Sequence, residues 1–526
     1  ANTTASKNTA VGTNSLVANT TGEHNVAVGY QALDANTTTN NNTAVGTRAL
    51  SANTTTDNTA VGYESMRLTT TGSANAALGR EALELNTTGA NNTALGYKSL
   101  QANTTANYNV GVGGYALNAN TTASNNTAVG YVAMYANTTG TANTAIGYGA
   151  LDANTTASGN TAVGADALTD NTTGANNTAV GENALANNTT ASSNTALGQN
   201  ALLTNTTGAN NVAVGHDSLR LNTTASNNTA VGYDALRATT TGHSNTAAGY
   251  QAMVANTTGS ENTAFGYAAL AAATTVDNNT AIGRLALTAN TTGALNTALG
   301  AAALQSNTTG GYNVALGPTA MSLNTTGLYN VAVGYLANAD NVDKNYNVAV
   351  GYHALGNNLA HNNTAVGFQC LEDNTSGTEN TATGVNAAYD ITTGSYNSAF
   401  GSSCLSALTT GSHNVALGRA ANQISTTGSF NIMLGPLARP SAADGNSETV
   451  VGYNVVGQGN STFTLGGGTS DSSIAWGATT WTAPSDIRLK EDIKDEEIGL
   501  EFVNELRPVT YQWRKAKDVS SEMEDY

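Results

Sequence analysis

A glycine that follows a mostly branched apolar residue returns along almost the whole chain at a fixed spacing. It starts with Gly12, Gly29, Gly46 and Gly62 and continues to Gly452, making 27 glycines. Of the 26 intervals between them, 24 are 17 residues long and two are 16. This period is too short for arrays of helical pairs, which need more than about 30 residues per repeat. The sequence therefore predicts an all-β fold, a parallel β-solenoid in which each unit forms one turn.

The consensus of the unit is N-T-A-V-G-Y-x-A-L-x-A-N-T-T-G-x-N, and its positions are numbered here from the first glycine as position 0. The T-A-V segment places β-forming residues at alternate positions, which predicts a short strand. The glycine predicts a bend or a close approach of two backbones. We expect N-T-T-G to be a turn whose Asn and Gly accept positive φ angles. With two or three short strands per turn, the 27 turns at about 4.8 Å each would build a rod of roughly 130 Å.

Three other positions repeat so strictly that ladders of like side chains are expected along the rod. Asn occupies position −4 in 26 of 27 units, and stacked amides can hydrogen-bond along an axis. Ala occupies position −2 in 24 units, while Leu or Met fills position +4 in most of them. The ladder residues of the first units are Asn8, Asn25, Asn42, Asn58, Ala27, Ala44, Leu33 and Leu50, beside Gly12, Gly29, Gly46 and Gly62.

The strand carries apolar or small residues on both of its faces. Positions −3 and −1 point away from the Ala at position −2, because side chains alternate along a strand. One face can line the solenoid's own core, and the other then needs a partner, which predicts an oligomer. Position +1 varies freely, as at Tyr30, Arg80 and Glu182, and is expected to face solvent. Its tyrosines leave two interpretations open, contact with a glycan or simple exposure on a strand.

Composition and charge exclude several classes of protein. Only 10% of the residues are charged and the apolar 40% is mostly Ala, Val and Leu, which predicts a thin and regular core. The net charge of −17 offers no basic surface for nucleic acid. No run of 18 apolar residues predicts membrane insertion. The six His are scattered and the acids are unpaired, so we expect no metal, no cofactor and no conventional enzyme. Cys370 and Cys404 are two units apart, too far for a disulfide.

The pattern changes near residue 439. Residues 1–438 are interpreted as the repeat shaft, and the Gly- and Ser-rich stretch 439–484 as a β neck. In residues 486–526, 19 of 41 residues are charged, and the spacing of Ile498, Phe502 and Leu506 predicts a short helix.

The repeat N-[TV]-A-[VLI]-G-x-x-A resembles the head repeat of trimeric autotransporter adhesins, which reads roughly N-S-V-A-I-G-x-x-A. The resemblance implies a left-handed parallel β-roll with three chains around one axis. The unit of that family is shorter, near 14 residues, so N-T-T-G is interpreted as an added loop or third side.

The segment S-D-I-R-L-K-E-D-I, followed by G-L-E-F-V-N-E-L-R-P-V-T-Y-Q-W, resembles the start of the endosialidase-type intramolecular chaperone domain. That domain ends many phage tail fibres and tailspikes. The resemblance implies that residues 485–526, a truncated start of the domain, promote trimerisation. It also implies single-turnover self-cleavage of the peptide bond between Pro484 and Ser485, with Ser485 and Lys490 as the catalytic pair. An ammonium group near a hydroxyl can activate it as a nucleophile or stabilise the transition state.

These observations favour an extracellular structural or adhesive fibre, a homotrimer from a phage tail or a microbial surface. Its partners would be copies of itself and a glycan or receptor on a host surface. The alternative is an ice- or surface-binding solenoid, since the N-T-T segments place Thr in registered rows. Thr also suits exposed strand positions by propensity alone, so a thermal hysteresis assay distinguishes the two hypotheses.

Overall fold

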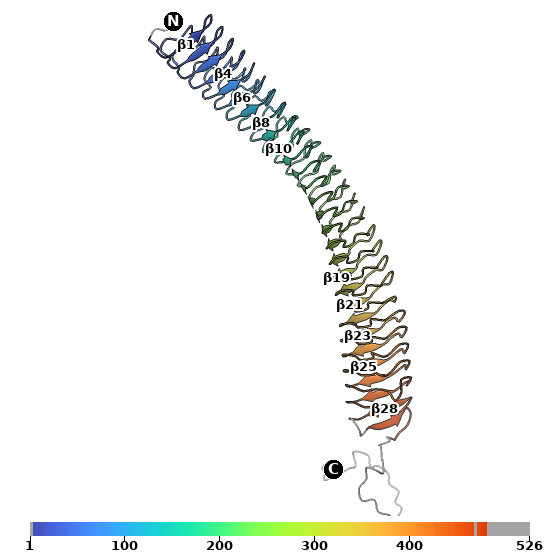
Figure 1. Cartoon of the computed structure of the whole chain (residues 1–526). Helices are drawn as coiled ribbons and strands as arrows, with labels where there is room; N and C mark the ends of the chain where they lie inside the picture. Colours follow the sequence, from blue (N-terminus) through green and yellow to red (C-terminus); the bar gives the residue numbers. More distant parts are fainter. Residues whose placement is uncertain (1–3, 468–470, 481–526) are drawn as a thin grey trace, which may run out of the picture.

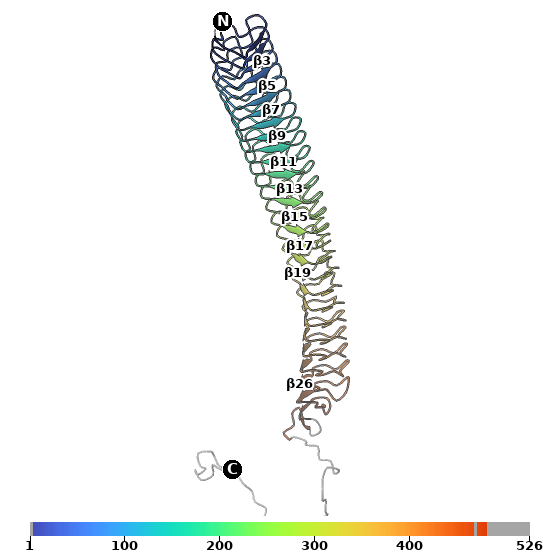
Figure 2. The same cartoon turned by 60° about the vertical axis from the view of Figure 1, so that its left-hand side comes forward.

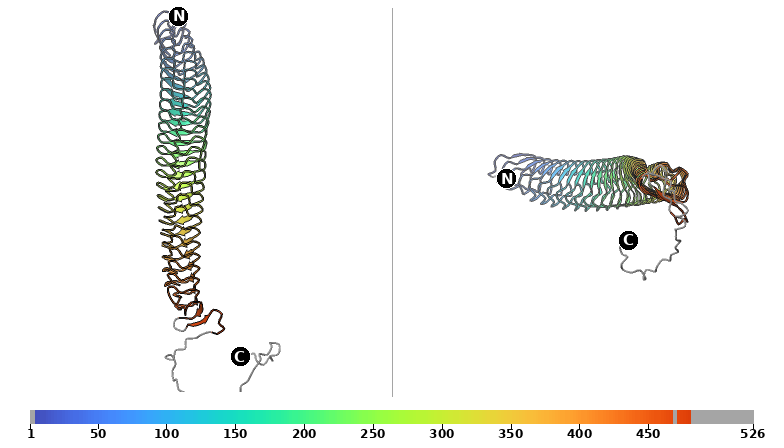
Figure 3. Two further views of the ribbon diagram at one scale, coloured as in Figure 1. Left: turned by 90° about the vertical axis from the view of Figure 1, so that its right-hand side faces the viewer. Right: turned by 90° about the horizontal axis from the view of Figure 1, so that it is seen from below.

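The computed structural model describes residues 4–467 and 471–480, and over these residues the chain is one long solenoid. The rod curves gently from the first turns, near β1, to the last, near β28 (Figure 1). Seen from the side, the turns stack as a single column of near-identical coils (Figures 2 and 3). The predicted fold class, an all-β parallel β-solenoid of 17-residue turns, is confirmed, and no helix occurs among the described residues.

Each turn contributes one strand of three residues, and two strands of four residues follow at the C-terminal end. The strands are β1 Thr9–Val11, β2 Val26–Val28, β3 Thr43–Val45, β4 Thr59–Val61, β5 Ala76–Leu78, β6 Thr93–Leu95, β7 Val110–Val112, β8 Thr127–Val129, β9 Thr144–Ile146, β10 Thr161–Val163, β11 Thr178–Val180, β12 Thr195–Leu197, β13 Val212–Val214, β14 Thr229–Val231, β15 Thr246–Ala248, β16 Thr263–Phe265, β17 Thr280–Ile282, β18 Thr297–Leu299, β19 Val314–Leu316, β20 Val331–Val333, β21 Val348–Val350, β22 Thr364–Val366, β23 Thr381–Thr383, β24 Ser398–Phe400, β25 Val415–Leu417, β26 Ile432–Leu434, β27 Thr449–Val451, β28 Thr462–Leu465 and β29 Ser472–Ala475.

The strands β1 to β28 form a parallel sheet in which each pairs with the strand of the next turn, and β29 adds to it in the antiparallel direction. The pairing is in register, so that Ala27 faces Ala44 and Val28 faces Val45. The expectation of two or three strands per turn is wrong, because each described turn has one. Residues at positions +2 and +4, such as Gln31 (φ 55°), are left-handed and interrupt the extended backbone. Axial hydrogen bonds nevertheless continue there, as from the Gln31 N–H to the Thr13 carbonyl at 3.0 Å.

The core is thin and is built from small and medium side chains. Ala27 at position −2, Ala32 at position +3 and Leu33 at position +4 are all fully buried. The same three slots are filled by buried Ala, Ser, Cys, Leu or Met in most other turns. Leu33 is held in the left-handed region (φ 52°), which a bulky residue rarely adopts. Burial of its side chain and the hydrogen bond of its N–H to the Ala49 carbonyl at 3.1 Å offset that cost.

The repeat glycine is required both by its backbone angle and by its neighbours. Gly29 has φ +137°, a conformation that L side chains rarely adopt. A Cβ added to Gly29 would lie 2.5 Å from the Gly46 carbonyl oxygen of the next turn, and one on Gly12 would lie 2.7 Å from that of Gly29. Both predicted roles of this glycine, a bend and a close approach of backbones, therefore operate at the same residue.

The asparagines at position −4 form a buried ladder that ties side chains to the backbone of the next turn. The Asn25 N–H donates to Asn8 Oδ1 at 2.8 Å, and the Asn42 N–H donates to Asn25 Oδ1 at 3.0 Å. The Asn58 N–H continues the ladder to Asn42 Oδ1 at 3.0 Å. The amide nitrogen of Asn25 donates to the Thr39 carbonyl at 2.8 Å. Each such amide thus satisfies a buried backbone donor and a buried backbone acceptor.

A second buried Asn ladder runs through the N-T-T segments at position +7. Asn103 Nδ2 donates to Asn86 Oδ1 at 2.9 Å and to the Ala106 carbonyl at 3.2 Å. The chain bends at the two Thr of N-T-T-G, as expected for a turn, but the expected positive φ at its Asn and Gly is wrong, since the left-handed non-Gly residues lie at positions −5, +2 and +4. The Asn of this segment is there for its amide, which is buried and bonded along the axis.

The C-terminal end of the stack departs from the repeat in two ways. β28 continues the parallel sheet beside β27, but β29 pairs with β28 in the antiparallel direction. Glu448 takes the ladder slot in the last unit, where its N–H donates to Asn431 Oδ1 at 2.9 Å. Its carboxylate accepts hydrogen bonds from the Ser441 hydroxyl at 2.6 Å and the Ser441 N–H at 3.0 Å. Glu448 therefore ends the Asn ladder by turning its hydrogen bonds back to a local loop.

Candidate functional site: the outward strand face and its flanking rows

The outward face of the sheet carries an apolar stripe at position −1, interrupted among the repeat units by Thr383, beside a row at position −3 that is mostly Thr. The Ala at position −2 is buried inside, whereas its neighbours at positions −3 and −1 are half-buried or exposed, as in β2. At position −1 the exposed fraction reaches 49% for Leu78 and 54% for Leu417. The large exposed residues of this row are Val11, Leu78, Leu95, Ile146, Leu197, Val231, Phe265, Ile282, Leu299, Phe400 and Leu417. Contiguous apolar surface of this extent marks an interaction surface rather than an ordinary solvated face.

Aromatic residues flank this stripe in two rows, at positions +1 and −5. His216, Tyr233, Tyr250 and Tyr267 stack in consecutive turns with centroids 5.2 to 5.4 Å apart and nearly parallel planes. The other row contains two stacks, Tyr312–Tyr329–Tyr346 and Tyr396–His413–Phe430, with centroids 4.8 to 5.4 Å apart.

This stacking decides what the rings can bind. An interior ring of a stack, such as Tyr250, has Tyr233 on one face and Tyr267 on the other. Only its edge and hydroxyl then face outward, so the ring is not free to stack on a sugar. The aromatic rows are therefore better explained as axial stabilisation, since offset-stacked rings gain about 0.5–1.5 kcal/mol per pair beyond burial.

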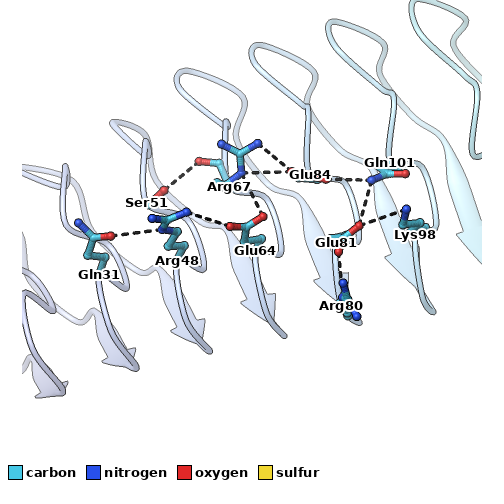
Figure 4. Close-up of polar contacts among 10 residues, drawn as sticks. All are labelled: Gln31, Arg48, Ser51, Glu64, Arg67, Arg80, Glu81, Glu84, Lys98 and Gln101. Atoms are coloured by element: carbon cyan, nitrogen blue, oxygen red, sulfur yellow. Dashed lines mark hydrogen bonds and ion pairs between the residues drawn. The ribbon is translucent and has the colours of Figure 1, made fainter.

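Charged side chains link successive turns at positions +2 and +5 near the N-terminal end (Figure 4). Arg48 Nη1 lies 3.2 Å from Glu64 Oε1, and Arg67 Nη2 lies 2.8 Å from Glu84 Oε1. Gln101 Nε2 donates to Glu84 Oε2 at 2.9 Å. The hydrogen bond to Glu84 raises the pKa of Arg67.

Glu81 lies between two cations in the same network (Figure 4). Arg80 Nε is 2.8 Å from one of its oxygens and Lys98 Nζ is 3.4 Å from the other. Burial raises the pKa of Glu81, but hydrogen bonds from Arg80 and Lys98 outweigh it and leave the pKa lowered. Glu81 is thus held ionised by its neighbours and acts, like Glu64 and Glu84, as a structural link between turns.

The first Thr of most N-T-T segments also bonds along the axis. Thr87 Oγ1 donates to the Thr104 carbonyl at 3.0 Å, and Thr104 Oγ1 donates to the Thr121 carbonyl at 3.1 Å. Since these hydroxyl protons are committed to the protein, this Thr row is part of the scaffold.

The two cysteines form no disulfide, as predicted, and lie buried in the small slot at position +3. Burial raises the pKa of both Cys370 and Cys404 to about 12. The part of the chain that the structure describes holds no group of three or more His, Cys, Asp or Glu side chains that could bind a metal ion. Within residues 4–467 and 471–480, no helix is long and apolar enough to cross a membrane.

The predicted catalytic pair, Ser485 and Lys490, and the predicted helix with Ile498, Phe502 and Leu506 lie outside the described residues. Residues 485–525 match a family model described as the chaperone of endosialidase. The match supports the resemblance of the C-terminal segment and covers only that segment of the 526 residues. No curated protein and no solved structure matches the chain.

Proposed function

We propose that the chain is the shaft of an extracellular attachment fibre in which three copies associate laterally through their outward strand faces. The observation that carries this proposal is the apolar stripe at position −1, whose side chains are half-buried or exposed in the single chain from one end of the rod to the other. Its natural cover is the same stripe on another copy, because self-complementary faces of one repeat meet with the same period. A phage tail or a microbial surface is the setting that the C-terminal match favours.

In this proposal residues 1–438 are the shaft, 439–484 the neck, and 485–526 the start of the chaperone segment that brings three chains together. The need for such a segment follows from the repeat. Near-identical turns can pair in many shifted registers, each displaced by one turn of about 4.8 Å. An assembly segment at one end would align the three chains before the strand faces meet.

The proposed self-cleavage is a single acyl transfer followed by hydrolysis. Ser485 Oγ attacks the carbonyl carbon of Pro484, the peptide C–N bond breaks, and the Ser485 amine leaves with a proton. Water then hydrolyses the ester, which releases the Pro484 carboxylate and restores the hydroxyl. Lys490 would take up the hydroxyl proton or stabilise the oxyanion.

Two measurements test these parts separately. Light scattering of the purified chain tests association, and subunit mass on a denaturing gel tests cleavage. We expect a particle of three chains, and a subunit shortened to residue 484 that becomes full length in Ser485→Ala. A full-length wild-type subunit, unchanged by Ser485→Ala, would refute the cleavage and leave the association proposal to the scattering result.

A further inference from the structure

We propose that a groove near the C-terminal end of the rod is a binding site for a neutral glycan. The groove has a volume of about 560 Å³, within the usual range for small-ligand sites. It is lined by Gln369, Asn386, Tyr389, Asp390, Ser403, Ser406, Ala407 and Gln423. This inference rests on the proposed attachment function and gives that function a place and a ligand class.

The groove exists because short side chains replace long ones at positions that are filled elsewhere. Positions +2 and +5 of earlier turns carry Arg, Glu and Gln, which bridge neighbouring turns and cover the surface between them (Figure 4). In the turn of Gly401 the same positions hold Ser403 and Ser406, and position +2 of the next turn holds Ala420. Larger residues of the adjacent turns, Tyr389 on one side and Gln423 on the other, then stand as walls.

The lining offers the mixed donors and acceptors that sugar hydroxyls require. Gln369, Asn386 and Gln423 present amides, each of which can donate and accept, and Asp390 presents a carboxylate that accepts. Asn386 Oδ1 is buried and has no hydrogen-bond partner in the chain. A buried acceptor without a partner is costly, so a ligand hydroxyl bonded to it would gain more than one at an exposed site.

Tyr389 supplies an aromatic surface of a kind that the stacked rows lack. It stands at position +5, outside both aromatic rows, and no other ring of the described residues stacks on it. Its ring is half-buried against the groove. One face of a sugar ring is made of C–H groups, which pack favourably on such an aromatic surface.

Charge selects the class of glycan. Glu372 raises the pKa of the Tyr389 hydroxyl, followed by burial and by Asp373 and Asp390. Burial, then Asp373, raises the pKa of Asp390. Asp390 thus lines the groove, and the carboxylates of Glu372 and Asp373 lie close enough to act on Tyr389 or Asp390, so their negative charge would repel sialylated, sulfated or phosphorylated sugars. Neutral hexoses and N-acetylhexosamines carry no such penalty.

The groove would remain open in the assembled fibre. It lies among positions +2, +5 and +6, in the segment that follows the strand, whereas the proposed contact between chains uses positions −3 and −1. It spans four successive turns, from Gln369 to Gln423, or about 14 Å along the axis at about 4.8 Å per turn. That length suits a short oligosaccharide lying parallel to the rod.

The test is binding of the intact chain to an array of defined neutral oligosaccharides and their sialylated counterparts. We expect retention of neutral members and at least a tenfold weaker signal for the sialylated ones. Tyr389→Ala and Asp390→Asn should each weaken the neutral signal about tenfold or more. Matched controls are Tyr135→Ala and Asp170→Asn, which alter the same repeat positions, +5 and +6, in turns far from the groove.

Three outcomes would overturn the proposal. These are no retention of any neutral glycan, stronger retention of sialylated glycans, or equal loss of binding in the control variants. Light scattering on the same samples separates this failure from failure of the fibre proposal. A particle of three chains that binds no neutral glycan refutes the groove alone, and a single chain that binds one refutes the assembly alone.

Discussion

Removal of one ladder amide tests how the turns are held together. Asn228 lies in mid-rod, where its Nδ2 donates to the Gly242 carbonyl and its Oδ1 accepts from the Asn245 N–H, both at 2.9 Å. In Asn228→Ala both backbone groups lose their partner while they remain buried. An orphaned buried group costs about 1–3 kcal/mol, so two should cost about 4 kcal/mol. At about 1.4 kcal/mol per factor of ten, the local opening constant should rise about 1,000-fold.

Hydrogen exchange on the intact chain measures this effect turn by turn, because a solenoid can open locally. The amide protons of the strands β14 and β15 should lose protection, while turns several repeats away keep theirs. Asn227→Ala is the matched control, since Asn227 is the exposed neighbour with φ 63° and Ala occurs naturally at the same position in Ala74. Equal protection in Asn228→Ala and Asn227→Ala would refute the role given to the ladder.

Three other changes have defined outcomes. Gly232→Ala should lower local stability by about 1–3 kcal/mol because of its φ of +132° alone, and by more because the new Cβ would lie 2.5 Å from the Gly249 carbonyl oxygen. Hydrogen exchange rates equal to those of the wild type would contradict this close approach. Asn422→Leu should stabilise its turn by about 2 kcal/mol. Asn422 is fully buried at position +4 with neither amide atom hydrogen-bonded, and its φ is already that of the leucines at this position. Faster hydrogen exchange of that turn in the variant would contradict this. The thiols of Cys370 and Cys404, with pKa raised to about 12, should resist iodoacetamide at pH 8 until the chain is unfolded. Rapid alkylation of the folded chain would contradict the burial of the thiols. The unfolded thiols ionise near 9.0 and the folded ones near 12, so the free energy of unfolding should be constant below about pH 9 and fall as the pH rises from 9 to 12.

The sequence predicts the solenoid well because one period governs backbone and side chains together. The repeat glycine is needed for its φ angle and for the close approach of the next turn, so no other residue replaces it at this position. The Ala at position −2 faces a core with no room for more than a small side chain in most turns. Both constraints recur from unit to unit of one chain, and the consensus sequence therefore predicts them.

Other features escape the consensus for identifiable physical reasons. The Asn of N-T-T-G is typical of a β-turn. Its other role, as a buried amide that bonds to the preceding repeat, is not visible within a single unit; Asn103, for example, donates to Asn86 Oδ1. Leu33 in a left-handed conformation contradicts its local preference and is held there by its burial. The groove could be predicted only by comparing the same positions between adjacent turns, where Ser406 lies between Tyr389 and Gln423 at position +5 and Ser403 precedes Ala420 at position +2.

The apolar stripe raises the central question, because a single chain leaves Leu78, Leu299 and Leu417 between 46% and 54% exposed. Multi-angle light scattering of the purified chain answers it most directly. Lateral association of three chains predicts a particle of three times the chain mass of 53.0 kDa, or three times the shorter subunit if self-cleavage occurs. Replacement of exposed position −1 residues by Lys in several turns should reduce that mass to one chain. A native particle with the mass of a single chain would contradict the account of the stripe as an interface between copies.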